Sequence, residues 1–164
     1  MKIIFNISFF VIIFWFICGI LGLILPFQSD LILLDKILLG PNWEQWCGYD
    51  HLGRPICERL IMGAKTSLSV AIIVVFISFI VGTFFGVIGA WFGGICDRFL
   101  VIMIDIFIAF PGILLAIVLA GLLGPGLVNT VIALSVVSWV GLSRLARIQT
   151  LSIKNRDHII AAHA

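Results

Sequence analysis

The residues best suited to chemistry lie in three places: a charged stretch between two apolar segments, one carboxylate inside an apolar segment, and a basic C-terminal end. The charged stretch contains the side chains that could bind a metal or form a disulfide, namely Cys47, Asp50, His51 and Cys57. Their spacing matches no usual zinc pattern, so we expect ordinary loop residues there and no metal site. Whether Cys47 and Cys57 pair stays open, because sequence alone gives no geometry.

The carboxylate of Asp105 lies inside a long apolar segment. If a helix enters the membrane at Phe99, this carboxylate lies roughly 9 Å deep, because a helix rises about 1.5 Å per residue. A charge at that depth should face other helices and find a partner. The candidate partners are Arg98, Arg144 and Arg147. Two interpretations remain equally open: a gating or pathway-lining residue, and a structural ion pair.

Two further features of the apolar segments concern helix shape. Pro111 lies in the middle of the segment that contains Asp105, where it should bend a helix and could form part of a gate. Gly82, Gly86 and Gly89 follow helical spacing in the preceding segment. Such small residues let helices approach closely in lipid, so we expect close packing there in preference to a substrate path.

The C-terminal end becomes basic after the last apolar segment. Its cations are Arg144, Arg147, Lys154 and Arg156, and the chain then reads Asp157-His158-Ile159-Ile160-Ala161-Ala162-His163-Ala164. A short basic helix that leaves the bilayer suits contact with a cytoplasmic partner. We therefore expect this end of the chain to contact a partner in the cytoplasm.

These features must be positioned by membrane-spanning helices. The chain has 164 residues, of which 62% are hydrophobic and 11% charged, and its mean hydropathy is +1.27. These values exclude a water-soluble domain, and a net charge of +2 gives no reason to expect nucleic-acid binding. Spanning a bilayer takes about 20 apolar residues. The segments that qualify are 1–25, 67–91, 99–123 and 127–145, and they predict an all-α membrane protein.

The distribution of Lys and Arg predicts the orientation. Most of the cations fall at the N-terminus, after the second span and after the fourth, which places the N-terminus in the cytoplasm. Residues 26–66 then form an outer, periplasmic segment. Within it, Pro55 should start a short amphipathic helix on the membrane surface, and Trp43, Trp46 and Tyr49 suit the interfacial layer.

Several strings, taken in this order and spacing, resemble the inner-membrane permeases of ATP-binding-cassette importers for dipeptides, oligopeptides and nickel. The strings are Asp50-His51-Leu52-Gly53-Arg54, Arg59 to Leu68, Trp91-Phe92-Gly93-Gly94 with Asp97-Arg98, Asp105 to Pro111, Leu123 to Leu127, and Ala161-Ala162. The chain departs from the family at Pro55, where an aspartate is usual, at Glu58, and at Ile160, where the family has a glutamate.

The resemblance implies a six-helix bundle of the type I importer class, of which this chain supplies four spans, so an incomplete chain is expected. Residues 67–164 correspond to the N-terminal part of the permease domain. The family's docking element maps onto residues 154–164, where Asp157 and His158 would be capping residues or partner contacts, followed by Ile160, Ala161 and Ala162. The family's periplasmic motif maps onto Asp50, Gly53, Arg54 and Arg59.

The resemblance also implies the partners. They are two cytoplasmic ATP-binding subunits that hold ATP and Mg, a second permease chain, a periplasmic solute-binding protein, and the lipid of a bacterial inner membrane. The chain itself should bind no cofactor and catalyse no reaction, since it has no phosphate-binding G-x-x-x-x-G-K-[ST] string. Two alternatives stay open: a structural membrane fragment without transport, and an ion-coupled carrier that uses Asp105.

Overall fold

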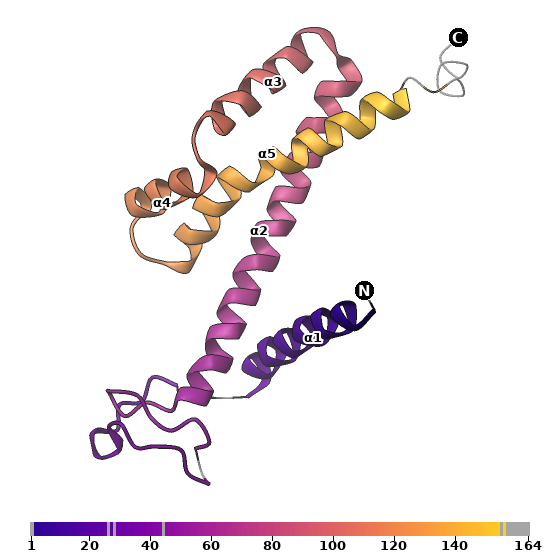
Figure 1. Cartoon of the computed structure of the whole chain (residues 1–164). Coiled ribbons are helices and arrows are strands. Elements are labelled where there is room, and N and C mark those ends of the chain that lie inside the picture. Colours follow the sequence, from indigo (N-terminus) through magenta and orange to yellow (C-terminus); the bar gives the residue numbers. More distant parts are fainter. Residues whose placement is uncertain (1, 26, 28, 44, 155, 157–164) are drawn as a thin grey trace. The chain divides into compact units, whose positions relative to one another are not determined.

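A computed structural model describes residues 2–25, 27, 29–43, 45–154 and 156. Within these residues the chain is helical apart from loops and turns, and contains no strand (Figure 1). The elements are α1 (Lys2–Ile24), the short 3-10 helix η1 (Leu34–Lys36), α2 (Ile56–Phe92), α3 (Gly94–Ala109), α4 (Gly112–Leu123) and α5 (Leu127–Lys154). The predicted all-α fold is confirmed. Contacts divide the chain into two units, Met1–Ser69 and Val70–Ala164.

Three of the described helices are long and apolar enough to cross a membrane by themselves: α1, α2 and α5. The pair α3 and α4 qualifies only as a broken span, because the two helices meet at an angle of 83°. The break lies at Phe110, whose backbone is extended (φ −102°, ψ 140°) because the following Pro111 disfavours helical geometry there. The bend predicted at Pro111 is therefore a full interruption of the helix.

One expected boundary differs from the structure. The short interfacial helix expected after Pro55 is not separate from the second span, because α2 runs without interruption from Ile56 to Phe92. Its first turn closes with a bond from the Arg59 amide to the Pro55 carbonyl at 3.2 Å. The span expected over residues 127–145 lies within α5, and the helix continues beyond it to Lys154, since no proline or glycine interrupts its final turns.

In the first unit, α1 packs on the beginning of α2 through glycine. A Cβ atom at Gly22 would lie 2.9 Å from the Lys65 Cβ and 3.0 Å from the Ile61 carbonyl oxygen. The absence of a side chain thus sets how closely the two helices approach. Most other side chains of α1 from Ile7 onward are large, apolar and exposed, which suits a surface in contact with lipid or another membrane chain.

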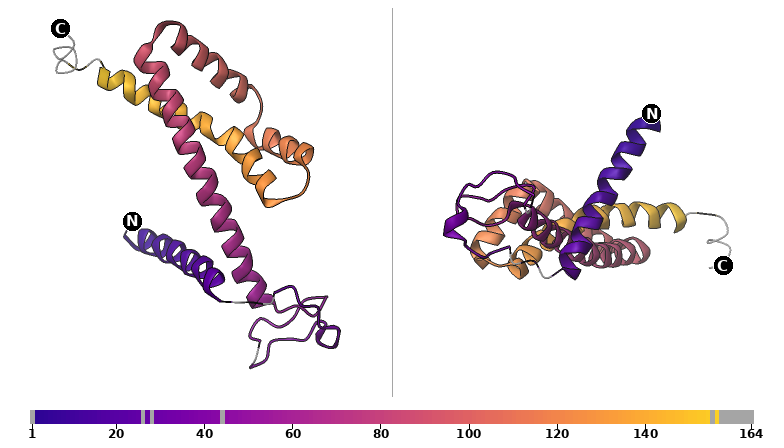
Figure 2. Two further views of the ribbon diagram at one scale, coloured as in Figure 1. Left: turned by 180° about the vertical axis from the view of Figure 1, so that it is seen from behind. Right: turned by 90° about the horizontal axis from the view of Figure 1, so that it is seen from below.

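In the second unit, α5 crosses α2 at two glycines, and Figures 1 and 2 show this crossing from opposite sides. A Cβ atom at Gly82 would lie 2.6 Å from the Trp139 carbonyl oxygen, and one at Gly86 would overlap the Ser143 carbonyl oxygen. The close packing predicted for this stripe is confirmed. Gly89 serves a different neighbour, Leu100 of α3.

A small apolar core joins α3 to α5. Leu100 and Ile104 of α3 and Val140 of α5 are buried, and Trp139 and Phe107 pack against them. The Trp139 ring lies 5.6 Å from the Phe107 ring in an edge-to-face arrangement. Aromatic pairs of this geometry contribute beyond the area that they bury, so Trp139 helps to hold α3 against α5.

Candidate functional site

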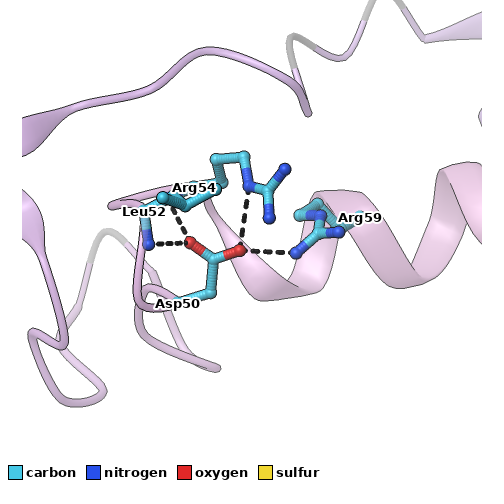
Figure 3. A network of polar contacts seen from close by, with 4 residues as sticks. All are labelled: Asp50, Leu52, Arg54 and Arg59. Carbon is cyan, nitrogen blue, oxygen red and sulfur yellow. Dashed lines mark hydrogen bonds and ion pairs between the residues drawn. The ribbon is translucent and has the colours of Figure 1, made fainter.

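The first candidate site is a polar network centred on Asp50, in the loop between α1 and α2 (Figure 3). One carboxylate oxygen accepts bonds from the backbone amides of Leu52 (2.8 Å) and Arg54 (2.9 Å). The other accepts bonds from the guanidinium groups of Arg54 (2.9 Å) and Arg59. A single carboxylate thereby connects a tight turn to the first turns of α2. The structure thus brings three residues of the predicted periplasmic motif together.

Gly53 is the fourth motif residue, and the turn requires a glycine at this position. Its φ is +72°, a conformation that side chains disfavour, and a Cβ atom there would overlap the Leu33 carbonyl oxygen. The turn is closed by bonds of 3.0 Å from the Gly53 amide to the Asp50 carbonyl and from the Asp50 amide to the Arg54 carbonyl. The geometry of this turn therefore explains why the string begins with Asp50 and ends with Gly53-Arg54.

The electrostatics of this network keep Asp50 ionised. Its side chain is only 11% exposed. Burial by itself acts to raise the carboxyl pKa, but the amides of Arg54 and Leu52 and the Arg54 guanidinium outweigh it, so the pKa lies well below its ordinary value. Two guanidinium groups around one ionised carboxylate make a charge-assisted structure that is stronger than neutral hydrogen bonds.

A disulfide joins the same loop to α2. Cys47 and Cys57 are bonded, with their Cα atoms 5.5 Å apart, which answers the question that the sequence left open. Beside it, the Gln45 side-chain amide donates to the Glu58 carboxylate at 3.2 Å. The loop thus has a covalent and a polar attachment to the first turns of α2, in addition to the Asp50 network.

The loop presents two tryptophans outward. Trp43 is 96% exposed and Trp46 is 80% exposed, and both line a shallow depression together with Pro41 and Asn42. Tyr49, expected in the same interfacial group, is instead buried, with its hydroxyl 3.3 Å from the Lys36 ammonium, which donates to it. The structure therefore separates a structural tyrosine from two tryptophans that remain available for contact.

The second candidate site is the C-terminal part of α5. The Arg147 guanidinium donates to both carboxylate oxygens of Asp97, from Nε at 2.6 Å and from Nη2 at 2.7 Å. Nearby, the Lys154 ammonium donates to the Trp91 carbonyl at 2.6 Å. Sequence reasoning considered Arg147 as a partner of Asp105 and missed Asp97. The one available signal was that both residues were expected on the cytoplasmic side, with Asp97 between the second and third spans and Arg147 after the fourth.

Asp105 and Pro111 are the intramembrane candidates. Asp105 lies on an exposed face of α3, and it makes no ion pair with any residue that the structure describes. The pairing expected with Arg98, Arg144 or Arg147 is therefore absent from the described part of the chain. Pro111 precedes the first residue of α4 at the break between the two helices, so it shapes the span beyond Asp105.

The expected docking element lies almost entirely outside the described residues. This applies to Asp157, His158, Ile160, Ala161 and Ala162. The structure does describe the helix that leads to them, since α5 runs unbroken from Leu127 to Lys154. Among the described residues, no three His, Cys, Asp or Glu side chains gather closely enough to hold a metal ion.

Long apolar helices, a broken span and a disulfide-bonded loop define a multi-spanning α-helical membrane protein. Residues 82–164 match the family model described as "Binding-protein-dependent transport system inner membrane component". The chain belongs to this family of bacterial inner-membrane permease components, as the sequence resemblance predicted.

Individual relatives agree with the family match. The chain is 34% identical over 157 residues to the dipeptide transport system permease protein DppC of Bacillus subtilis (strain 168), covering 93% of this chain and 48% of that protein. It is 36% identical over 130 residues to the glutathione transport system permease protein GsiD of Pectobacterium atrosepticum, covering 79% of this chain and 43% of that protein. It is 37% identical over 130 residues to the GsiD of Escherichia coli O6:K15:H31, again covering 79% of this chain and 43% of that protein. The chain thus spans about half the length of these relatives.

Proposed function

We propose that this chain forms membrane-spanning permease structure in an ATP-driven importer of dipeptides or oligopeptides. The observation that carries the proposal is the family match over residues 82–164. The names of two relatives state dipeptide and glutathione transport, and glutathione is itself a peptide. Peptides are therefore favoured over nickel, the other cargo that the sequence resemblance implied.

The disulfide supports an orientation with the N-terminus in the cytoplasm. Disulfides form and persist in oxidising compartments such as the periplasm. The Cys47–Cys57 bond therefore favours a periplasmic loop between α1 and α2, which agrees with the distribution of Lys and Arg. In this orientation Arg147 and Lys154 lie toward the cytoplasm, where ATP-binding subunits are found.

The proposed mechanism is mechanical coupling. ATP and Mg bind in two partner subunits, and closure of those subunits moves the docking element of residues 154–164. The helix α5, which leads directly into this element, carries the movement into the bundle, so the permease alternates between outward and inward access. A second permease chain completes the pathway, and Asp105 and Pro111 are proposed to lie along it or at its gate.

The loop between α1 and α2 is proposed to receive the periplasmic solute-binding protein. The Asp50 network and the Cys47–Cys57 bond fix the shape of this loop, while Trp43 and Trp46 remain exposed. Rigid exposed aromatic side chains are favoured at protein interfaces, because little conformational entropy is lost when they bind. The loop therefore offers a binding partner a surface whose shape is already fixed.

The test is purification followed by transport. The tagged chain, expressed in its bacterial host, is purified in mild detergent and its partners are identified. The assembled complex is then reconstituted in liposomes with a binding protein and radiolabelled dipeptide. We expect ATP-binding subunits to co-purify and dipeptide to accumulate only with ATP. A complex that accumulates nickel and no peptide would contradict the proposed cargo.

One observation favours a second candidate, an ion-coupled carrier. The exposed Asp105 carboxylate of α3, which lies between the exposed apolar side chains of Ile102 and Ile108, is the kind of group that binds a proton or cation in carriers. The same liposomes discriminate between the two. Uptake driven by a proton or sodium gradient without ATP, and abolished by Asp105→Asn, would favour the carrier.

A further inference from the structure

The contacts at the end of α5 join it to a turn far away in sequence. Arg147 and Asp97 are 50 positions apart, and their side chains are only 26% and 22% exposed. The Arg147 Nε donates to one carboxylate oxygen of Asp97 at 2.6 Å, and its Nη2 donates to the other at 2.7 Å. A two-point contact of this kind restricts rotation as well as separation, which a single contact between point charges does not do.

A second bond restrains the same pair of segments. The Lys154 ammonium donates to the Trp91 carbonyl at 2.6 Å, at the other side of the turn that joins α2 to α3. We call the residues Trp91, Asp97, Arg147 and Lys154 the latch. Its two side chains on α5, Arg147 and Lys154, are seven positions apart, about two helical turns, so their contacts together fix the direction of the last turns as well as their position.

The packing beneath the latch brings the segments together. A Cβ atom at Gly86 of α2 would lie 3.1 Å from the Arg147 backbone nitrogen and 2.8 Å from the Ala146 Cβ. The α2–α5 crossing thus places Arg147 beside α2, from where its side chain reaches Asp97 in the first turn of α3. The bidentate pair adds a directional polar contact to this packing.

We propose that the Asp97–Arg147 pair is a positioning device that makes the end of α5 and the start of α3 move as one body. Resting on the proposed function, this means that a movement of the docking element reaches α3 directly, in addition to its path along α5. Because α3 carries Asp105 and ends at the break before Pro111, the latch connects ATP-driven movement to the candidate gate.

The experiment compares transport with ATP consumption in the reconstituted importer. Variants Asp97→Asn and Arg147→Gln are assembled with the ATP-binding subunits, and both dipeptide uptake and ATP hydrolysis are measured. We expect each variant to bind the ATP-binding subunits like the wild type and to transport about tenfold less peptide per ATP hydrolysed, within the usual range of coupling between sites. The matched control is Arg144→Gln, an exposed cation on the same helix that makes no ion pair among the described residues.

A charge reversal protects the test against simple misfolding. The double variant Asp97→Arg with Arg147→Asp restores the attraction with the ions exchanged, so it should regain most of the lost transport per ATP. Unchanged transport per ATP in both single variants would overturn the inference while leaving the importer intact. Failure of the reversal to improve on well-assembled single variants would also overturn it. A wild-type complex without ATP-driven uptake would instead remove the proposed function, and the inference with it.

Discussion

The Arg147 guanidinium holds both carboxylate oxygens of Asp97, at 2.6 and 2.7 Å, and so joins α5 to the first turn of α3. Arg147 was expected as a possible partner of Asp105, and the structure instead gives it a contact between α3 and α5. Arg147 pairs with Asp97, near the turn that joins α2 to α3, and not with Asp105. Asp105 is left on an exposed face, where a partner chain or an aqueous path can meet it.

The Asp50 network predicts a measurable protection of the neighbouring disulfide. Asp50→Asn removes the charge that holds Arg54 and Arg59, so the loop should open more often and expose the Cys47–Cys57 bond. We expect faster reduction of this bond by dithiothreitol, followed by thiol labelling of the chain in membranes. Asp30→Asn, at an exposed position of the same loop, is the control and should reduce like the wild type.

The same network predicts the pH dependence of that protection. The pKa of Asp50 is lowered in the folded chain, so its stabilising contribution is complete above the unfolded value of about 3.9 and is lost as pH falls below it. Wild type and Asp50→Asn should therefore differ in rate of reduction by a constant factor above about pH 5. The factor should shrink as the medium is made strongly acidic, measured with an acid-active phosphine reductant. A difference that grows on acidification would contradict the assigned charge state.

Gly53 is predicted to be intolerant of any side chain. Gly53→Ala places a Cβ atom against the Leu33 carbonyl in a left-handed conformation, which costs about 1–3 kcal/mol for the backbone alone. The loop should become sensitive to protease added to right-side-out vesicles. Gly40→Ala is the matched control, because no atom lies within 4 Å of the position that its methyl group would take, and the substitution should leave cleavage unchanged.

The crossing of α2 and α5 should respond strongly to small increases in volume. Gly82→Ala brings a methyl group to 2.8 Å from the Leu142 Cβ, and relieving this overlap should cost about 1–3 kcal/mol. We expect a lower midpoint of thermal unfolding in detergent. Gly141→Ala on α5 has nothing within 4 Å and should unfold like the wild type. Equal midpoints for both variants would contradict the close crossing.

Asp105→Asn tests whether the Asp105 carboxylate contributes to the stability of this chain or to transport by the assembled importer. Because Asp105 has no ion-pair partner in the described part of the chain, its substitution should leave the thermal stability of the purified chain unchanged. Transport by the assembled importer should fall, since the carboxylate is then needed only between chains or along the pathway. Loss of stability in the purified chain would show an internal partner, and unchanged transport would remove Asp105 from the site.

The sequence predicted the all-α class and the helices α1 and α5 because long apolar segments signal spans directly. It did not predict the length of α2, since the change from the amphipathic turns after Pro55 to the apolar ones resembles a boundary although the helical backbone continues. At Pro111 the sequence indicated a bend but did not give its angle of 83°.

The candidate sites were also predictable only in part. The string from Asp50 to Arg54 was singled out by its resemblance to the permease family, but the turn and the carboxylate network that it forms were not predicted. The Cys47–Cys57 bond needed geometry that ten positions of sequence do not define. The Asp97–Arg147 pair depends on which faces of α3 and α5 meet, and several cations were equally placed to reach a carboxylate until the Gly86 crossing was known.

The most direct test of mechanical coupling is the location and contact of the docking element. In a background of Cys18→Ser and Cys96→Ser, His158→Cys is placed in the chain, and intact spheroplasts are treated with a membrane-impermeant maleimide. We predict no labelling from outside, labelling after the inner membrane is opened, and a crosslink from this cysteine to an ATP-binding subunit. Labelling of intact spheroplasts from the periplasmic side would place the end of α5 outside and contradict the proposed coupling.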